Sequence, residues 1–552
     1  MDKPDEAPRQ AAGDWSFLFK LTGALALAGI AQALFVFQRG GSTIGGFALL
    51  LLFLAPLLRP VMWRDRRARL ALAAAAFFAL VLAADPGVLA LLLYWTMLTT
   101  AALLPSTARF GDAWRWTARL VLHGVLSPFM PIRDLSLLQR ARRRTGSGGA
   151  GRLVMMLALP LLGTLIFLAL FAAANPLIEN FLISIDARVS PHTMVRLFFA
   201  GLIFLAVWSL LRPPRVTLPE TGMTGPAAAV DALPGVTRAS VVLSLCAFNL
   251  LFAVQNGLDL AFLWSGAPLP GDLTLAGYAH RGAYPLIATA LLAGLFVLVT
   301  LRPGSDTARS RGIRLLVTLW IAQNLLLVAS TIYRTFDYIE SYSLTELRIA
   351  ALIWMALVAV GLVLICWRLL RDRSAAWLIN ANMLAALLVL AGCSCVDLGR
   401  MAAAWNVRHA REVGGRGVEL DLCYLNQLGS SALLPLIELE ERPNLPAELR
   451  DRVQWLRDKA LRELSAVQAD WHGWTLRGAG RLADAQARAA AHRLPPPRPL
   501  NRDCDGREYV PPPPPPPLLP SREYVPPETN GSVLPSDDNT APPAPLTENE
   551  VR

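Results

Sequence analysis

The sequence predicts an all-α fold: a polytopic transmembrane helical bundle of about eleven spans, a small helical C-terminal unit and a disordered proline-rich tail. Composition is the first indication, because 54% of the 552 residues are hydrophobic and only 17% are charged, too apolar for an ordinary soluble domain. The second is a series of apolar runs between residues 15 and 396, most of them near the ~20 residues that cross a hydrocarbon core. The third is the change to polar sequence from about residue 400 onward.

The expected spans follow one another with mostly short connections. They occupy residues 15–37, 44–62, 69–84, 86–105, 153–175, 193–211, 239–263, 283–301, 313–333, 347–367 and 376–396. The third and fourth divide one apolar run at Asp85, Pro86 and Gly87, a strong turn signal. The first is not a cleavable signal peptide, since it is long and no A-x-A site follows before the next span.

Basic residues predict the side that each connection faces. The N-terminus and alternate loops hold 26 Lys and Arg residues, whereas the other set of loops holds six. The N-terminal residues 1–14 are therefore expected in the cytoplasm and the C-terminus on the extracytoplasmic side. Most of the net charge of +11 lies in the inner loops, which indicates contact with anionic lipid head groups of the bilayer rather than with nucleic acid.

The spans fall into an N-terminal group at 15–105 and a core at 153–396, separated by a cytoplasmic basic loop at 106–152. Within this loop, residues 112–129 suit a helix lying at the membrane surface, and a flexible basic linker follows at 140–152. The extramembrane unit at 397–494 contains one clear amphipathic helix, because apolar residues from Leu449 to Val467 recur at steps of three and four. This unit is too small for a large core of its own, so we expect it to dock on the membrane domain.

The tail at 495–552 is rich in proline, with seven consecutive prolines at 511–517, and should be disordered or polyproline II. The hexapeptide REYVPP occurs at 507–512 and again at 522–527. It is either a docking motif for an envelope protein, used twice, or a duplicated low-complexity spacer.

Cysteine and histidine patterns predict no metal site and no cofactor, because neither CxxC nor HExxH occurs. Four of the six cysteines lie in expected spans. The other two, Cys423 and Cys504, are able to form a disulfide if the C-terminal region is extracytoplasmic.

A polar cluster is expected where the ninth and tenth spans meet, in the connection at 333–348. Arg334, Asp337 and Tyr338 stand at i, i+3 and i+4, so one helical face presents a cation, an anion and a phenol. Further polar residues come from the seventh span and from the loop before the eighth, and carboxylates at such depth normally find partners. The candidate cluster comprises Asn256, Asp259, Tyr278, His280, Arg281, Tyr333, Arg334, Asp337, Tyr338, Thr345 and Arg348.

Within this cluster we expect Asp259 or Asp337 to pair with Arg281 or Arg334. One interpretation is that these residues only hold the outer ends of four helices together. The other is a ligand or signalling site.

Four segments resemble a known family: the helix around Gln255 and Asn256, YAHRGAYPL at 278–286, YRTFDYIESYSLTELR at 333–348, and the stretch at 403–436 that begins AAWNVRHAREV. DWHGWTLRGAGR at 470–481 is also similar to family sequence. The chain thereby resembles bacterial multi-pass membrane proteins of domain of unknown function 4173, with its relative 4153. Ser343 stands where the family pattern has Gly. The resemblance implies an inner-membrane protein without an assigned activity.

Three functions are compatible with these observations. We favour a non-enzymatic membrane protein whose outward-facing cluster binds a small ligand, a lipid head group or a protein partner in envelope sensing or assembly. A small-solute transporter is the alternative, although residues 286–301 and 350–367 contain no charge, unlike the polar path that ion-coupled transport usually needs. A membrane-embedded transferase is the third, and the first outer loop at 38–43 lacks the acidic residues typical of polytopic glycosyltransferases.

Overall fold

The computed structural model describes residues 17–107, 111–143, 191–214, 238–265, 310–415, 417–492 and 501–509, with isolated positions between 164 and 175 and at 292 and 296. In this part of the chain every regular element is helical, and the one β-bridge is isolated, between Arg502 and Glu508. The N-terminal segment at 1–14, most of the spans expected at 153–175 and 283–301, and the tail after residue 509 lie outside the described residues.

Eight described helices are long and apolar enough to cross a membrane. They are α1 (Phe17–Phe35), α4 (Arg66–Ala84), α5 (Val88–Leu103, continued by η1, Leu104–Ser106), α10 (Pro191–Leu211), α11 (Arg238–Leu258, continued by the π-helix η4, Asp259–Trp264), α14 (Arg311–Tyr342), α15 (Glu346–Arg371) and α16 (Ala375–Cys395). The span expected at 44–62 is the shorter apolar helix α2 (Thr43–Leu58). A multi-pass membrane protein is therefore supported, while the count of eleven goes beyond the described helices.

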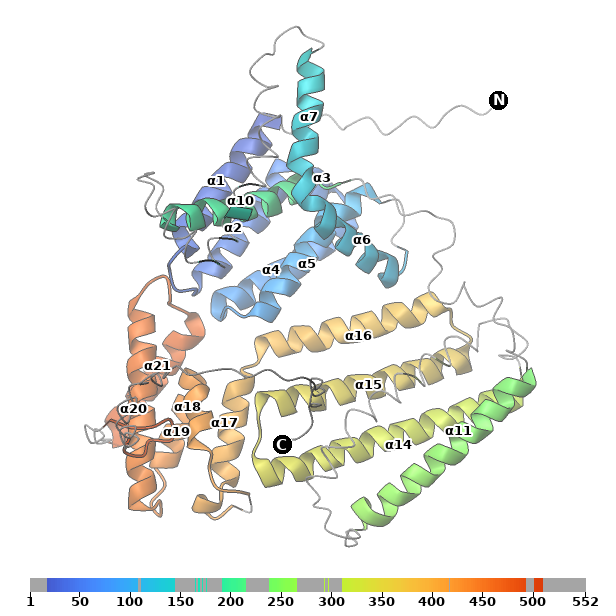
Figure 1. Ribbon diagram of the computed structural model, residues 1–552, viewed down its shortest axis with the longest axis vertical. Helices are drawn as coiled ribbons and strands as arrows, with labels where there is room; N and C mark the ends of the chain where they lie inside the picture. The colour runs from blue at the N-terminus through green and yellow to red at the C-terminus, as the bar shows by residue number, and fades with distance from the viewer. Residues whose placement is uncertain are drawn as a thin grey trace, which may run out of the picture.

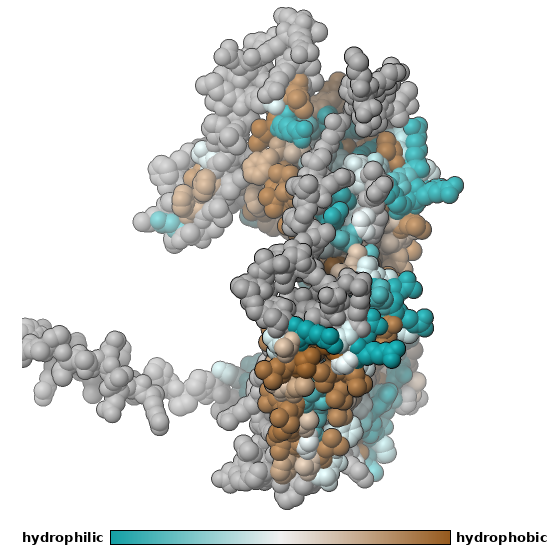
Figure 2. Space-filling model, turned by 90° about the vertical axis from the view of Figure 1, so that its right-hand side faces the viewer, coloured by the Kyte–Doolittle hydropathy of each residue, from teal (hydrophilic) through white to brown (hydrophobic). Residues whose placement is uncertain are grey.

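The membrane helices form two groups (Figure 1). In the first, α1, α2, α4, α5 and α10 share one apolar core, in which Trp208 and Tyr94 are the largest fully buried side chains. In the second, α11, α14, α15 and α16 lie side by side, and α16 also contacts α5. Figure 2 faces the right-hand side of Figure 1 and shows broad apolar areas open on the lower half of that face, with hydrophilic residues above them. Open apolar surface of this extent is expected where helices contact lipid.

The turn expected at Asp85 is present, because α4 ends at Ala84 and α5 begins at Val88. The two helices return antiparallel and pack against α2, where the Tyr94 hydroxyl donates to the Ala48 carbonyl at 2.6 Å. The backbone approaches so closely at Gly45 that a Cβ would collide with the main chain of α4. A tight approach of this kind is typical of small residues between membrane helices.

The connection expected at 333–348 is much shorter in the structure. Helix α14 continues from Arg311 to Tyr342, and only residues 343–345 connect it to α15. At 1.5 Å per residue, 32 residues extend about 48 Å, well beyond a hydrocarbon core of about 30 Å. The prediction placed the end of the helix at the first charges, whereas buried residues such as Ile339 still hold the following turns against the protein.

On the side of the Arg-rich loops, the short helix α3 (Val61–Arg64) lies between α2 and α4. The helix expected at 112–129 is α6 (Ala113–Leu126) followed by η2 (Ser127–Phe129), and α6 packs on α16, whose Asn380 side chain accepts from the Ala113 N–H at 2.7 Å. The linker predicted from residue 140 is wrong at its start, because α7 (Met130–Arg143) continues to Arg143.

The C-terminal unit consists of α17 (Leu398–His409), η5 (Arg411–Val413), α18 (Leu422–Gln427), η6 (Gly429–Ala432), α19 (Leu433–Glu440), α20 (Ala447–Ala469) and α21 (Leu476–His492). Helix α20 carries the expected stripe, buried from Leu449 to Leu464 and half-buried at Val467. A buried ion pair joins Arg457 of α20 to Glu440 of α19 at 3.1 Å. A disulfide between Cys423 and Cys504 attaches residues 501–509 to α18, as the sequence suggested.

Candidate functional site

The C-terminal unit docks on the membrane domain at the turn between α14 and α15. The Asn406 side chain of α17 accepts from the Leu344 N–H at 2.7 Å and donates to the Leu344 carbonyl at 2.9 Å. One amide thus satisfies both main-chain groups of a buried turn residue, as a neighbouring strand would. The Tyr424 hydroxyl also accepts from the Glu346 N–H at 3.0 Å, and burial raises the pKa of this phenol.

The turn itself is held by side chains at the start of α15. The Thr345 hydroxyl caps this helix by accepting from the Arg348 N–H. The Arg348 guanidinium donates to the carbonyls of Tyr342 and Ser343 and lies 4.5 Å from the centre of the Tyr338 ring. Arg348 is therefore occupied in closing the turn.

A second contact is made where α4 turns into α5. Arg477 of α21 forms an ion pair with Asp85 at 2.8 Å and donates to the Cys395 carbonyl at 2.7 Å. This arginine joins the C-terminal unit to both groups of membrane helices, since Asp85 follows α4 and Cys395 ends α16.

A third contact involves the turn between α1 and α2, where the Ser42 N–H donates to the Trp474 carbonyl at 2.8 Å. A Cβ at Gly41 would collide with the carbonyl oxygens of His472 and Trp474. The segment from Asp470 to Arg481, which resembles family sequence, therefore anchors the unit to the N-terminal helices.

Part of the predicted polar cluster is buried between α11 and α14. Of the four predicted pairings, the structure contains Asp259 with Arg334, whose side chains are only 1% and 4% exposed. Asp259 begins the π-helical turn η4, and it also accepts from the Gln255 amide at 3.0 Å.

The polar contacts continue along the same pair of helices in both directions. Towards the C-terminal unit, the Trp264 ring stacks on Tyr333 at 5.3 Å and its N–H donates to Ser330 at 3.1 Å. Deeper in the bundle, Gln323 donates to the Asn249 side chain at 3.1 Å, and Asn256 donates to the Gln323 carbonyl at 3.1 Å. These interhelical hydrogen bonds support the structural interpretation for the buried part of the cluster.

An open pocket of about 180 Å³ lies beside the turn, between the end of α14 and α17. It is lined by Ile339, Glu340, Ser343, Trp405, Asn406, His409, Ala410, Gly417, Val418 and Leu420. The Glu340 side chain is exposed and forms no ion pair with any described residue. The His409 ring stacks on Trp405 at 3.9 Å and contacts the Trp405 carbonyl at 2.9 Å through Nδ1. Because a carbonyl only accepts, Nδ1 is the donor in this hydrogen bond.

The predicted cluster is thus divided in the structure. Asn256, Asp259 and Arg334 belong to the buried contacts, whereas Tyr338, Thr345 and Arg348 form the turn next to the pocket. Tyr333 packs on Trp264, and Asp337 is half-buried without an ion pair to a described residue. Tyr278, His280 and Arg281 lie outside the described residues.

Residue patterns did not identify Trp405 and His409 as neighbours of Glu340. The only signal was their place in the segment AAWNVRHAREV, which resembles the family. In the described part of the chain, no group of three or more His, Cys, Asp or Glu side chains is arranged to hold a metal ion.

Fold and site together define a class: a multi-pass helical membrane protein whose C-terminal helical unit is docked against three turns at one end of the bundle. The family model described as Domain of unknown function (DUF4153) matches residues 68–439. The chain therefore belongs to the DUF4153 family. This confirms the resemblance, because 4153 is the relative of 4173 that the sequence analysis named. The match includes Glu340, Trp405 and His409 but ends before the segment at 470–481. Searches of curated proteins and of solved structures found no match.

Proposed function

We propose that this protein is an inner-membrane ligand sensor of the bacterial envelope, whose pocket between α14 and α17 binds a small molecule with an ammonium group on the extracytoplasmic side. The observation that carries the proposal is the open pocket that touches both the membrane domain and the docked C-terminal unit. A ligand there contacts both parts, so its binding stabilises the docked arrangement.

The chemistry of the pocket favours a cationic donor. Glu340 supplies a carboxylate, and the aromatic ring of Trp405 supplies a polarisable surface for a cation. The nearest arginine of the turn, Arg348, is already engaged by two carbonyls and the Tyr338 ring. A volume of about 180 Å³ is below the roughly 300 to 1,000 Å³ of sites for drug-sized ligands, so the ligand is of head-group size.

Two observations support the extracytoplasmic placement. The turns that contact the C-terminal unit belong to the Arg-poor set of loops, while the Arg-rich turns lie at the opposite helix ends. The disulfide between Cys423 and Cys504 is of a kind that persists in an oxidising compartment.

Thermal unfolding of the full-length protein in detergent tests the proposal, with choline and ethanolamine as probes. We expect a saturable rise in Tm with at least one probe, lost in the Glu340→Gln and Trp405→Leu variants. Glu463→Gln, which removes an exposed carboxylate of α20 away from the pocket, should keep the full rise. Absence of a rise with both probes, or equal loss in the control, would contradict the assignment.

Solute transport is the second candidate, because the polar contacts between α11 and α14 extend inward to Asn249 and Gln323. The side-chain oxygens of Asn256 and Asn324 are buried and accept no hydrogen bond from a described residue. Uptake of labelled choline or ethanolamine into proteoliposomes that is lost in Asp337→Ala, in protein whose thermal unfolding matches the wild type, would favour transport. Binding of the probe without uptake would favour the ligand sensor over the transporter.

A further inference from the structure

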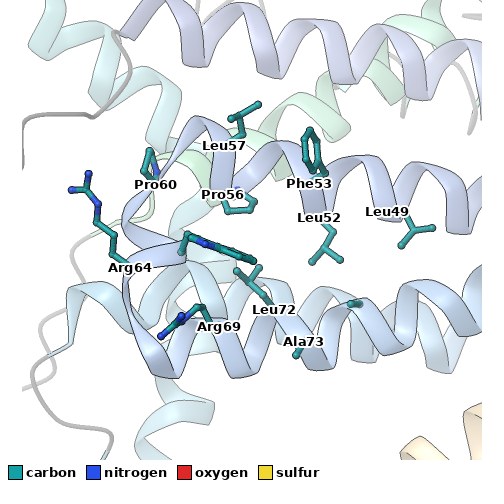
Figure 3. Close-up of a pocket in the computed structure, with 12 residues that line it drawn as sticks. Leu49, Leu52, Phe53, Pro56, Leu57, Pro60, Arg64, Arg69, Leu72 and Ala73 are labelled. Atoms are coloured by element: carbon teal, nitrogen blue, oxygen red, sulfur yellow. The ribbon is translucent and has the colours of Figure 1, made fainter.

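At the end of the bundle away from the C-terminal unit, a groove of about 680 Å³ opens between α2 and α4 (Figure 3). Leu49, Leu52 and Phe53 line it from α2, and Ala73 and Ala76 line it from α4. The groove exists because these two alanines face large side chains and leave the space between the helices unfilled. Its volume is in the range of ordinary ligand cavities.

Proline determines the end of the groove. Pro56 lies inside α2, which ends two residues later at Leu58, and the chain then turns through Pro60 into α3. Since α2 has only 16 residues, it spans about 24 Å, less than a hydrocarbon core of about 30 Å. The turn and α3 therefore lie near the depth of the lipid head groups.

Among the described residues that line the groove, two are charged: Arg64 at the end of α3 and Arg69 in the first turn of α4. Figure 3 shows both where α2 turns through α3 into α4, with the apolar side chains extending from there along the groove. Both are exposed, and neither forms an ion pair with a described residue. Arg67, by contrast, is engaged by Asp65 and by the Thr107 carbonyl.

We propose that this groove is a binding site for one anionic phospholipid of the leaflet that contains the Arg-rich loops. The phosphate lies between the guanidinium groups of Arg64 and Arg69, and one acyl chain lies along the groove against Phe53 and Ala73. Trp63, which is 63% exposed and also lines the groove, is of the residue type that settles at head-group depth.

Charge and shape together select this occupant. A water-soluble phosphate would pair with the two arginines but leave the apolar part of the groove empty. A lipid without net charge would fill the apolar part but would add no net negative charge beside the arginines. A diffuse attraction of anionic lipid to all the basic loops would not depend on which arginines are present. The proposal concerns the opposite membrane face from the ammonium pocket and is independent of it.

Native mass spectrometry of the full-length protein in detergent tests the site, with phosphatidylglycerol, phosphatidylcholine of the same acyl chains, and glycerol phosphate as probes. We expect one phosphatidylglycerol bound at least tenfold more tightly than phosphatidylcholine, and glycerol phosphate not to compete. The Arg64→Gln/Arg69→Gln variant should lose this preference. Arg66→Gln/Arg373→Gln, which removes two exposed arginines outside the groove at the same end of the bundle, should keep it.

A third variant, Ala73→Phe/Ala76→Phe, keeps both arginines and fills the apolar part, so it should also lose the bound lipid. Each variant is compared only after its thermal unfolding matches that of the wild type. If this test fails for the phenylalanine variant, Ala73→Leu fills less of the groove and should weaken binding in part. Equal loss in the Arg66→Gln/Arg373→Gln control, retention in Arg64→Gln/Arg69→Gln, or equal binding of phosphatidylcholine would overturn the proposal.

Discussion

Ser343 connects α14 to α15 with a φ of 68° and a ψ of 167°. This region is occupied almost only by glycine, because any side chain there strains the backbone by roughly 1 to 3 kcal/mol. The resemblance led us to expect Gly at this position, and the positive φ is a physical reason for that expectation. Ser343→Gly should therefore raise the free energy of unfolding by about 1 kcal/mol, measured by thermal unfolding in detergent. Ser341→Gly, inside the last turn of α14, should lower it by a similar amount, and equal effects would contradict the argument.

Asp259 and Arg334 form a buried ion pair, and its contribution to the free energy of unfolding depends on both partners being present. Arg334→Met alone leaves the carboxylate in an apolar environment, so we expect a loss of about 3 to 5 kcal/mol in the free energy of unfolding. Asp259→Leu combined with Arg334→Met should recover most of it, since apolar residues replace both charges. A double-mutant cycle by thermal unfolding checks this, and simple additivity of the two losses would exclude the pairing.

His123 of α6 is buried near the positive charge of Arg59, and burial first and this charge second lower its pKa from 6.5 to about 4. The unfolded chain therefore binds a proton at a pH where the folded protein does not. Stability from this group is complete above pH 6.5 and declines as the pH falls towards 4. Relative to His123→Leu, the wild type should lose Tm progressively across this interval; parallel Tm curves would show that the imidazole is not buried in its neutral form.

At the scale of elements, the segment at 501–509 is attached to α18 and α20 by more than the disulfide. Arg502 pairs with Asp451 at 2.7 Å, and Arg452 pairs with Asp505 at 2.9 Å.

Because Cys423 and Cys504 form a disulfide, denatured but unreduced protein should react with a thiol reagent at four cysteines, and reduced protein at all six. Mass spectrometry of the labelled chain checks the count, and Cys423→Ser should expose Cys504 to the reagent. Six reactive thiols before reduction would show that the pair is not oxidised.

The length of α14 shows how elements differ from their sequence signals. Hydropathy indicated an end near residue 333, because charged and aromatic residues begin there. The helix nevertheless continues to Tyr342, since one face of the added turns is buried at Arg334 and Ile339. Amphipathic continuation of a span is supported by its tertiary contacts, which hydropathy along one chain does not contain.

At the scale of the whole molecule, the side of the membrane that the C-terminal unit occupies determines what it can sense. An alkaline phosphatase fused after Arg552 should be active and a fluorescent protein at the same position dark. The reason is that the three turns that hold the unit belong to the Arg-poor loops. The opposite pair of signals would place the unit and its disulfide in the cytoplasm and would remove the basis for an extracytoplasmic ligand.

The sequence by itself determined the membrane class, most helix positions and the break at Asp85. It also predicted the apolar stripe of α20 and the possibility of a disulfide between Cys423 and Cys504. Each of these follows from local composition or from periodicity along one element. It also reduced the partner of Asp259 to two arginines, because a carboxylate at that depth needs a cation.

Only the tertiary structure decided which turns the C-terminal unit contacts, that Glu340, Trp405 and His409 line one pocket, and that Arg64 and Arg69 line one groove. These are contacts between elements that are separated in sequence or divided by a turn. Their geometry depends on how helices pack and where small residues leave space, and neither hydropathy nor periodicity contains that information.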